Sequence, residues 1–131
     1  MQTPRNLQVW HRALELAIET YLLTQLFPRE ERFGLASQMR RAAVSVGSNI
    51  AEGCGRRGDR ELIVFLHHAL GSLSELEFQL EVAVQIRLAA DEPLQSTGER
   101  LVEVRRMLVR LIAAVNARTT RVAGTAEVRS E

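Results

Sequence analysis

The sequence predicts a single all-α domain, an antiparallel up-down-up-down bundle of four helices. Alanine and leucine are abundant, aromatic residues make up only 5% of the chain, and no stretch alternates with the period of two that a half-buried strand needs. Apolar residues instead recur at spacings of three and four in four segments. The three prolines (Pro4, Pro28 and Pro93) fall outside these segments or at their boundaries, and short connections favour antiparallel neighbours.

The first two helices are expected over residues 7–26 and 34–54. Asn6 is the expected N-cap of the first, and Pro28 ends it. The apolar stripe of the first helix comprises Leu7, Trp10, Leu14, Ala17 and Tyr21. That of the second comprises Leu35, Met39, Ala43, Val46 and Ile50, beside a face of small residues, Ala36, Gly47 and Ala51. Because glycine costs about 1 kcal/mol relative to alanine inside a helix, we expect close packing to compensate at Gly47.

The third helix is expected over residues 59–89, with Asp59 as its N-cap, after a glycine-rich break at residues 53–58. Its seam comprises Leu62, Leu66, Ala69, Leu73, Leu76, Leu80 and Ala83. The fourth helix has the seam Leu101, Val104, Leu108, Leu111 and Val115. Its start is either a first turn containing Pro93 or a capping box of Ser96 and Glu99. It ends near Arg118, so the domain spans residues 1–118 and residues 119–131 form a disordered tail.

The sequence offers no catalytic motif, cofactor site or metal site, and we expect a non-enzymatic protein. The G-x-G-x-x-G match at residues 53–58 follows a helix rather than a strand, so it predicts a turn. His67 and His68 diverge on a helix. Arg56 and Arg57 could lower the pKa of the Cys54 thiol, but no histidine is near it in sequence, and we favour a buried or half-buried cysteine without a chemical role. Without a signal peptide or an apolar run of about 20 residues, we expect a cytoplasmic protein with no membrane contact.

Charge is distributed unevenly, although the net charge is only +1 and every basic side chain is arginine. Residues 34–60 carry five arginines against two acids, residues 61–99 one against seven, and residues 100–131 seven against three. Genomic base composition would give the same preference for arginine, but guanidinium groups also suit phosphates. The candidate nucleic-acid-binding residues are Arg40, Arg41, Arg56, Arg57, Arg60, Arg105, Arg106 and Arg110. The alternative is that the arginines pair with Glu75, Glu77 and Glu81. No aromatic residue is interleaved with them, so we expect contacts with the nucleic-acid backbone rather than with bases.

A polar stripe on the second helix has two interpretations. It comprises Gln38, Arg41, Ser45, Asn49 and Glu52, which share one face. The stripe is either a solvated flank with local hydrogen bonds or a polar seam buried between helices or between subunits, where it would fix the register.

A distinctive string, FGLASQMRRAAVSVGSNIAEG at residues 33–53, resembles the four-helix bundle family named for 23S rRNA intervening sequences, also called S23. Further matching residues are Val9, Trp10, Ala13, Phe27, Pro28, Glu31, Phe65, Leu66, Ala69, Gly71, Ser72, Glu75, Leu76 and Glu77. The family usually has proline where this chain has Gly47. The resemblance implies a bundle that commonly assembles as a homopentameric ring, and no catalytic residues transfer. Similar bundles are nucleic-acid-binding accessory proteins of the reverse transcriptases of diversity-generating retroelements.

Together these observations predict a homo-oligomeric bundle that binds RNA or DNA through arginine-rich faces. The alternative is a protein-interaction scaffold or accessory subunit that docks a nucleic-acid-processing enzyme as its protein partner.

Overall fold

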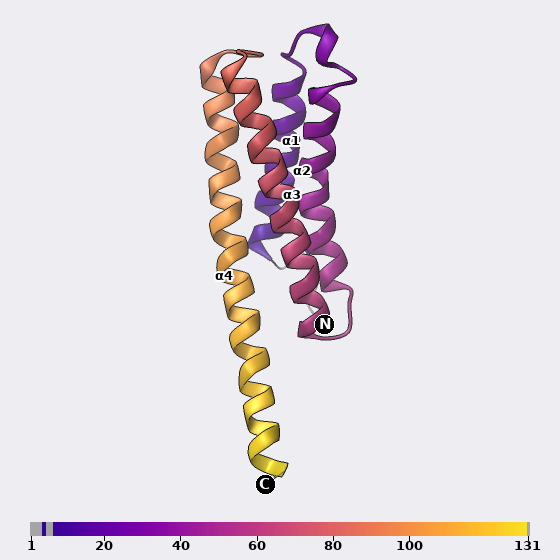
Figure 1. Cartoon of the computed structure of the whole chain (residues 1–131), viewed down its shortest axis with the longest axis vertical. Coiled ribbons are helices and arrows are strands. Elements are labelled where there is room, and N and C mark those ends of the chain that lie inside the picture. The colour runs from indigo at the N-terminus through magenta and orange to yellow at the C-terminus, as the bar shows by residue number, and fades with distance from the viewer. Residues whose placement is uncertain (1–3, 5–6, 131) are drawn as a thin grey trace.

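The computed structural model is entirely helical (Figure 1). The structure describes residue 4 and residues 7–130, with side chains for residue 4 and residues 7–121. The helices are α1 (Gln8–Thr24), α2 (Leu35–Cys54), α3 (Asp59–Gln85) and α4 (Asp91–Ser130), and a 3-10 turn, η2 (Arg29–Glu31), precedes α2. No strand occurs among these residues, which confirms the all-α prediction.

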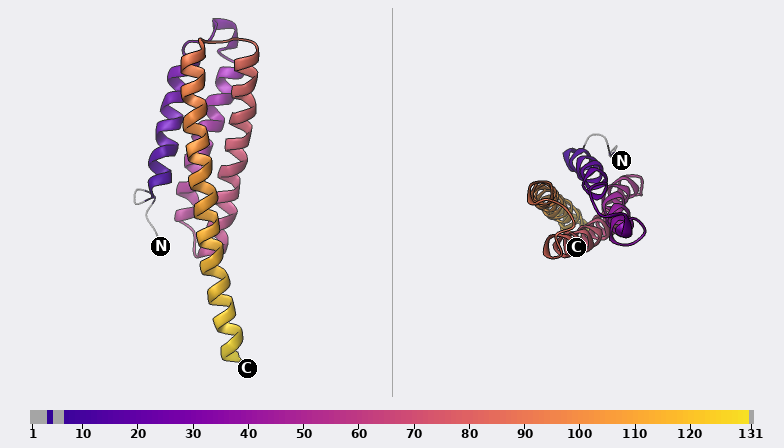
Figure 2. Two further views of the ribbon diagram at one scale, coloured as in Figure 1. Left: turned by 90° about the vertical axis from the view of Figure 1, so that its left-hand side faces the viewer. Right: turned by 90° about the horizontal axis from the view of Figure 1, so that it is seen from above.

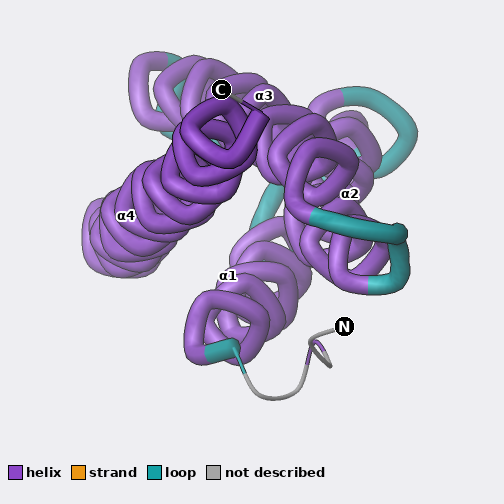
Figure 3. The backbone as a smooth tube through the Cα atoms, turned by 90° about the horizontal axis from the view of Figure 1, so that it is seen from below, coloured by secondary structure: helices purple, strands orange, loops and turns teal. Residues whose placement is uncertain are grey.

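The helices run alternately up and down and occupy the four corners of a bundle (Figures 2 and 3). Neighbours around the bundle are α1 and α2, α2 and α3, α3 and α4, and α4 and α1, so α2 lies diagonally opposite α4. Contacts at two heights show the antiparallel alignment of α3 and α4, because Arg105 meets Glu77 while Arg118 meets Asp59. The C-terminal end of α4 projects beyond the other helices.

The predicted apolar stripe of α1 is right only in part, since Leu7 is buried and Trp10 and Ala17 pack against the core. Leu14 and Tyr21 are 46% and 43% exposed. The buried face comprises Val9, Ala13, Leu16, Thr20, Leu23 and Thr24. Thr20 can be buried on this face without an unsatisfied hydroxyl group, because the hydroxyl donates a hydrogen bond of 2.7 Å to the Leu16 carbonyl. The helix has apolar residues on two faces, and only the one facing its neighbours is buried. The expected N-cap, Asn6, lies outside the described residues, and Leu7 occupies the N-cap position without a side-chain hydrogen bond.

The predicted seams of α2 and α3 are largely confirmed. Within α2, Met39, Ala43, Val46 and Ile50 are fully buried, whereas Leu35 packs at the edge of the core. Every predicted seam residue of α3 is buried. The N-cap of α3 is Gly58 rather than Asp59, since the chain turns with a positive φ of 94° that glycine adopts without strain.

Two boundaries differ from the predictions. α3 ends at Gln85 rather than near residue 89, because the chain turns away at Arg87, which has a left-handed φ of 56°. α4 begins at Asp91, which places Pro93 in its first turn, and Ser96 donates a hydrogen bond to Glu19 instead of capping the helix.

The predicted end of α4 near Arg118 is also wrong, whereas the predicted disorder of residues 119–131 stays a prediction. The helix continues to Ser130. No proline interrupts this stretch, and the helix needs no apolar period where it has passed the end of its neighbours.

Two glycines of α2 lie at helix contacts that differ in the space available for a side chain. A Cβ atom at Gly53 would lie 2.9 Å from the Phe65 Cβ atom and 3.0 Å from Leu62 Cδ1, so α2 and α3 require glycine there. A Cβ atom at Gly47 would lie 3.8 Å from the Ala13 Cβ atom, an ordinary contact. The expectation that close packing requires Gly47 is therefore wrong.

Candidate nucleic-acid interface

A shallow hollow of about 460 Å³ lies where the end of α1, the chain after η2 and the first turns of α2 meet. It is named here the arginine–aromatic depression, and its lining comprises Tyr21, Arg32, Phe33, Ser37, Arg40, Arg41 and Val44. The lining holds three guanidinium groups and two aromatic rings, and it contains no carboxylate. Such a surface attracts anions that also present flat, apolar faces.

Two arginines of the depression lie over its aromatic rings. The Arg40 guanidinium carbon is 4.8 Å from the centre of the Tyr21 ring, and that of Arg32 is 5.4 Å from the centre of the Phe33 ring. The Arg40 Nε atom also donates a hydrogen bond of 2.7 Å to Thr24 Oγ1, which fixes this side chain between α1 and α2. Stacked guanidinium groups retain N–H donors at their edges, where a phosphate can accept them.

The depression also has side chains that are open to solvent. Arg41 is exposed and has no carboxylate or ring partner among the described residues. Phe33 is 88% exposed. The Phe33 ring is therefore accessible to a molecule in solution.

Local structure explains why these side chains converge. Pro28 ends the α1 segment, η2 reverses the chain, and Gly34 begins α2. The Glu31 carboxylate accepts a hydrogen bond of 3.3 Å from the Leu35 backbone N–H, where the partial positive charge of the α2 N-terminus stabilises it. This places the carboxylate at the helix end and not in the lining of the depression.

The sequence analysis missed this combination of charge and rings. It named Arg40 and Arg41 but expected no aromatic residue among the arginines. Tyr21 precedes Arg40 by nineteen residues, and only the turn between α1 and α2 brings the two together. Arg32 and Phe33 were a signal in the sequence, since a cation beside an aromatic residue in a polar loop is typical of an exposed binding surface.

The arginines of the α2–α3 turn form a second, partly neutralised group. Arg56 pairs with Glu52 at 2.7 Å and lies 4.7 Å from the centre of the Phe65 ring. Arg57 and Arg60 are exposed, and the described part of the chain provides neither with a carboxylate partner. They follow the C-terminal end of α2, whereas Arg41 lies in the first half of that helix, so the predicted set does not form one continuous surface.

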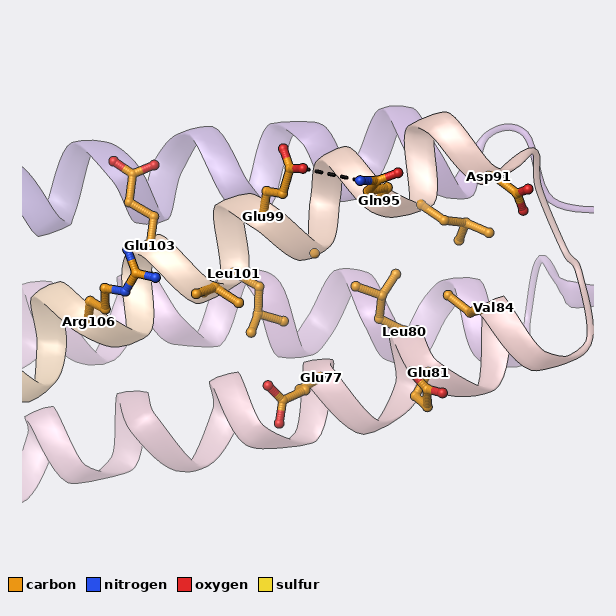
Figure 4. A pocket seen from close by; sticks show the side chains of 13 residues that line it. Glu77, Leu80, Glu81, Val84, Asp91, Gln95, Glu99, Leu101, Glu103 and Arg106 are labelled. Carbon is orange, nitrogen blue, oxygen red and sulfur yellow. Dashed lines mark hydrogen bonds between the residues drawn. The ribbon is translucent and has the colours of Figure 1, made fainter.

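The arginines of α4 lie beside an acidic groove between α3 and α4, which has a volume of about 1130 Å³ (Figure 4). Five carboxylates, those of Glu77, Glu81, Asp91, Glu99 and Glu103, line this groove together with one arginine, Arg106. Arg105 pairs with Glu77 at 3.5 Å, and Arg110 has no carboxylate partner in the described region. A polyanion approaching Arg106 would meet the surrounding carboxylates, so this face suits nucleic acid poorly.

The predicted alternative, pairing of arginines with Glu75, Glu77 and Glu81 of α3, holds only for Arg105 and Glu77 among the described ion pairs, and Arg118 pairs with a different acid of α3, Asp59. Other pairs join α4 to α1 instead: Arg100 contacts Glu15 and Glu19, and Arg12 contacts Glu103. Among the described residues, the arginines of the depression therefore form no ion pair with a carboxylate of α3.

The polar stripe of α2 divides between its two predicted interpretations. In its middle, Ser45 and Ser72 share a hydrogen bond of 2.8 Å across the α2–α3 contact, and Asn49 donates to the Ser45 carbonyl at 2.9 Å. These residues form a half-buried seam between helices of one chain. At its ends, Gln38, Arg41 and Glu52 are exposed. A role of this stripe between subunits stays a prediction.

Cys54 is buried, and burial raises the pKa of its thiol. Burial confirms the favoured interpretation of Cys54 as a buried cysteine, and the pKa shift is opposite to the one that Arg56 and Arg57 could cause, because desolvation of the thiolate dominates. Across the residues that the structure describes, no cluster of three or more His, Cys, Asp or Glu side chains is placed to hold a metal ion. No helix in that same region is long and apolar enough to span a membrane.

Comparison with known proteins places this geometry in a family. The family model described as 23S rRNA-intervening sequence protein matches residues 5–110. The chain belongs to this family. A solved structure from Bacteroides thetaiotaomicron, described as a protein with unknown function from the S23 ribosomal protein family, has a TM-score of 0.74 and 25% sequence identity, covering 80% of this chain and 95% of that chain. No curated protein matches the sequence.

Membership of the 23S rRNA-intervening sequence family confirms the resemblance drawn from residues 33–53. The matched range includes the whole arginine–aromatic depression and the acidic groove, and it ends before Arg118. The family match therefore fixes the fold, while the chemistry of each surface must be argued from its own residues.

Proposed function

We propose that this chain is a non-enzymatic, homo-oligomeric cytoplasmic protein that binds nucleic acid through the arginine–aromatic depression. The observation that carries the proposal is the meeting of three guanidinium groups and two exposed rings on a lining without carboxylates. The arginines supply phosphate contacts, and the Phe33 and Tyr21 rings supply surfaces for unstacked bases. Stacking requires accessible base faces, so the favoured ligand is single-stranded RNA or DNA.

The proposal refines the predicted set of arginines. Arg40 and Arg41 lie in the depression and are joined by Arg32. Arg57 and Arg60 provide a further, isolated basic site at the other end of the bundle. Arg105 and Arg106 lie beside carboxylates of the acidic groove and are not assigned a nucleic-acid contact.

Fluorescence anisotropy with a labelled single-stranded RNA, a single-stranded DNA and a duplex of the same length tests the proposal. We expect both single strands to bind more tightly than the duplex. Three phosphate contacts predict a slope of about −2 for the logarithm of the binding constant against the logarithm of salt concentration, at about −0.7 per contact. Affinity that is independent of salt would contradict the proposal. Arg29 is an exposed arginine outside the depression, and a loss of binding in Arg29→Ala as large as the loss in an alanine variant of a depression arginine would also contradict it.

Self-association has its own support in α1 and the turn that follows it. Four large aliphatic side chains, Leu14, Ile18, Leu22 and Leu26, are 46–60% exposed and succeed one another every four residues. Soluble proteins rarely leave such a row uncovered, so the row favours a protein contact. A second copy of the chain fits the proposed homo-oligomer, for which the family resemblance implies a ring of five.

The same exposed row also supports the alternative function, in which the chain docks a nucleic-acid-processing enzyme. Sedimentation of the purified chain separates the two alternatives. A multiple of the 14.7 kDa chain mass that Ile18→Glu reduces supports the homo-oligomer. A wild-type monomer would instead assign the row to another protein.

A further inference from the structure

A stripe of four exposed charged residues runs along the outward face of α4. It comprises Glu99, Glu103, Arg106 and Arg110, and it is named here the α4 charge stripe. The spacings of four, three and four residues place all of them on one side of the helix. The opposite side carries the fully buried Leu101, Val104 and Leu108. The stripe therefore faces away from the bundle core.

The order of charges in the α4 charge stripe is self-complementary. Glu99 lies as many residues before the midpoint between Val104 and Arg105 as Arg110 lies after it. Glu103 and Arg106 are related in the same way. If a second α4 helix lies antiparallel to the first, with a two-fold axis through that midpoint, each glutamate faces an arginine of the other copy. The symmetry generates every contact twice.

Contacts within one chain leave most of these charges unpaired. Glu99 accepts a hydrogen bond of 3.5 Å from Gln95 and has no cationic partner in the described structure. Arg106 and Arg110 are likewise unpaired among the described residues, whereas Glu103 meets Arg12 at 3.1 Å.

The surroundings of the stripe permit a second helix to approach. Val102 and Val109 flank it and are 44% and 51% exposed, so they provide apolar area near the axis. Ala113 and Ala117 continue the outward face with small side chains, and helices pack at axial separations of about 8–10 Å where side chains are small.

We propose that a second copy of this chain docks on the α4 charge stripe in an antiparallel arrangement about a two-fold axis. Glu99 pairs with Arg110 of the second copy, and Glu103 pairs with Arg106. Exposed ion pairs each contribute about 1 kcal/mol or less and are screened by salt, so the association is weak and strongest at low ionic strength. The arginine–aromatic depression belongs to α1 and α2, and α2 lies diagonally across the bundle from α4, so it stays open in the pair.

Charge reversal at one pair of positions tests both the surface and its orientation. Glu99→Arg would place arginine against Arg110 of the second copy, and Arg110→Glu would place glutamate against Glu99, each twice. In an Ile18→Glu background, which removes the contact proposed for the exposed row of α1, we expect either single variant to raise the dissociation constant of the remaining self-association at least about tenfold in sedimentation velocity at low salt. The combined variant Glu99→Arg/Arg110→Glu restores opposite charges across the axis and should recover wild-type association.

An equimolar mixture of the two single variants gives the sharpest readout. Each variant alone repels its own copies, whereas one copy of each brings opposite charges together at both symmetric contacts, so the mixture should associate. Glu30→Arg and Arg29→Glu make the same charge changes in η2 and should leave association unchanged. Thermal melts monitored by circular dichroism verify that all variants fold.

Several outcomes would overturn the proposal. A wild-type chain that stays monomeric at low salt excludes the contact. Self-association that persists unchanged in both single variants excludes this surface, whatever its stoichiometry. Single variants that dissociate but are not rescued in the mixture or in the combined variant exclude the antiparallel register. Because none of these variants alters the depression, loss of nucleic-acid binding is scored separately.

Discussion

The arginine–aromatic depression and the acidic groove occupy opposite sides of the same half of the bundle, yet they carry opposite charge. The depression, on the α1–α2 side, has three arginines and no carboxylate in its lining, whereas the groove, between α3 and α4, has five carboxylates and one arginine. A net charge of +1 conceals this separation. The difference shows that binding of a polyanion depends on where charges lie within one chain rather than on their sum.

The largest effect is expected from reversing charge in the depression. Arg32→Glu/Arg41→Glu replaces two phosphate contacts with repulsion. Charge-assisted hydrogen bonds contribute about 1.5–3 kcal/mol each, so single-strand affinity should fall at least about a hundredfold. Anisotropy titrations measure the loss, and the matched reversal Arg29→Glu should cost far less. Comparable losses in the two variants would mean that charge, and not this site, determines binding.

Removing the exposed rings should give the next largest effect. Phe33→Ala eliminates a stacking surface, and stacking contributes about 1–3 kcal/mol per base, which corresponds to a roughly five- to 150-fold loss for single strands. Duplex binding, which leaves base faces hidden, should change little. Since Phe33 is 88% exposed, the melting temperature should stay at the wild-type value. An equal loss for duplex and single strand would refute the role of stacking.

Gly47→Ala changes the contact between α1 and α2 outside both regions. A new Cβ atom would meet the Ala13 Cβ atom at an ordinary 3.8 Å, so the variant should gain about 0.8–1 kcal/mol of helix stability. The melting temperature should rise by about 4 °C. Nucleic-acid affinity should not change, because neither region contains this position. A lower melting temperature would show that α1 and α2 do require glycine there.

Neutralising the groove should have a smaller effect. Glu81→Gln removes one carboxylate that accepts a hydrogen bond of 2.8 Å from Gln85 and has no cationic partner in the described structure. Reduced repulsion should raise nucleic-acid affinity by about twofold or less at low salt, and the gain should vanish near 0.15 M, where the screening length is about 8 Å. A large gain, persisting at high salt, would place nucleic acid directly in the groove.

The smallest effect concerns Asp59 and Arg118, which lie outside both regions. Hydrogen bonds of 2.8 and 2.9 Å from Arg118 lower the pKa of the Asp59 carboxyl group. A lowered folded-state pKa stabilises the fold above the unfolded pKa of about 3.9, and that contribution disappears as the pH falls through the folded value.

Arg118→Ala should therefore reduce stability at pH 7 by about 1 kcal/mol or less, as expected for an exposed pair. The difference from wild type should shrink below about pH 4. Thermal melts across this range measure it, and a difference that stays constant with pH would assign the effect of Arg118 to packing instead.

Much of the fold was predictable because the seams of α2 and α3 repeat without competition. The α1 stripe was predicted only in part, because the helix carries Leu14, Ile18 and Leu22 as well as Leu16 and Leu23, and spacing does not say which face meets a neighbour. The buried face also contains a polar residue, Thr20, which the apolar spacing does not count. Its hydroxyl group can be buried because it donates a hydrogen bond to a backbone carbonyl of the preceding turn.

The candidate site was predictable only in part for a similar reason. Arg40 and Arg41 could be named from charge alone, but the ring of Tyr21 reaches Arg40 through a turn of the chain whose geometry no periodicity encodes. The pairing of Arg100 with α1 rather than α3 likewise depends on which corners of the bundle are adjacent.

The projecting end of α4 has a practical consequence for handling the molecule. From Arg118 to Ser130 the helix extends about 18 Å at 1.5 Å per residue, away from the end of the bundle that carries the depression. A dye or an immobilising tether attached at the C-terminus would thus sit on a built-in spacer. Chains anchored to a sensor chip in this way would all present their ligand-facing end to the flowing solution.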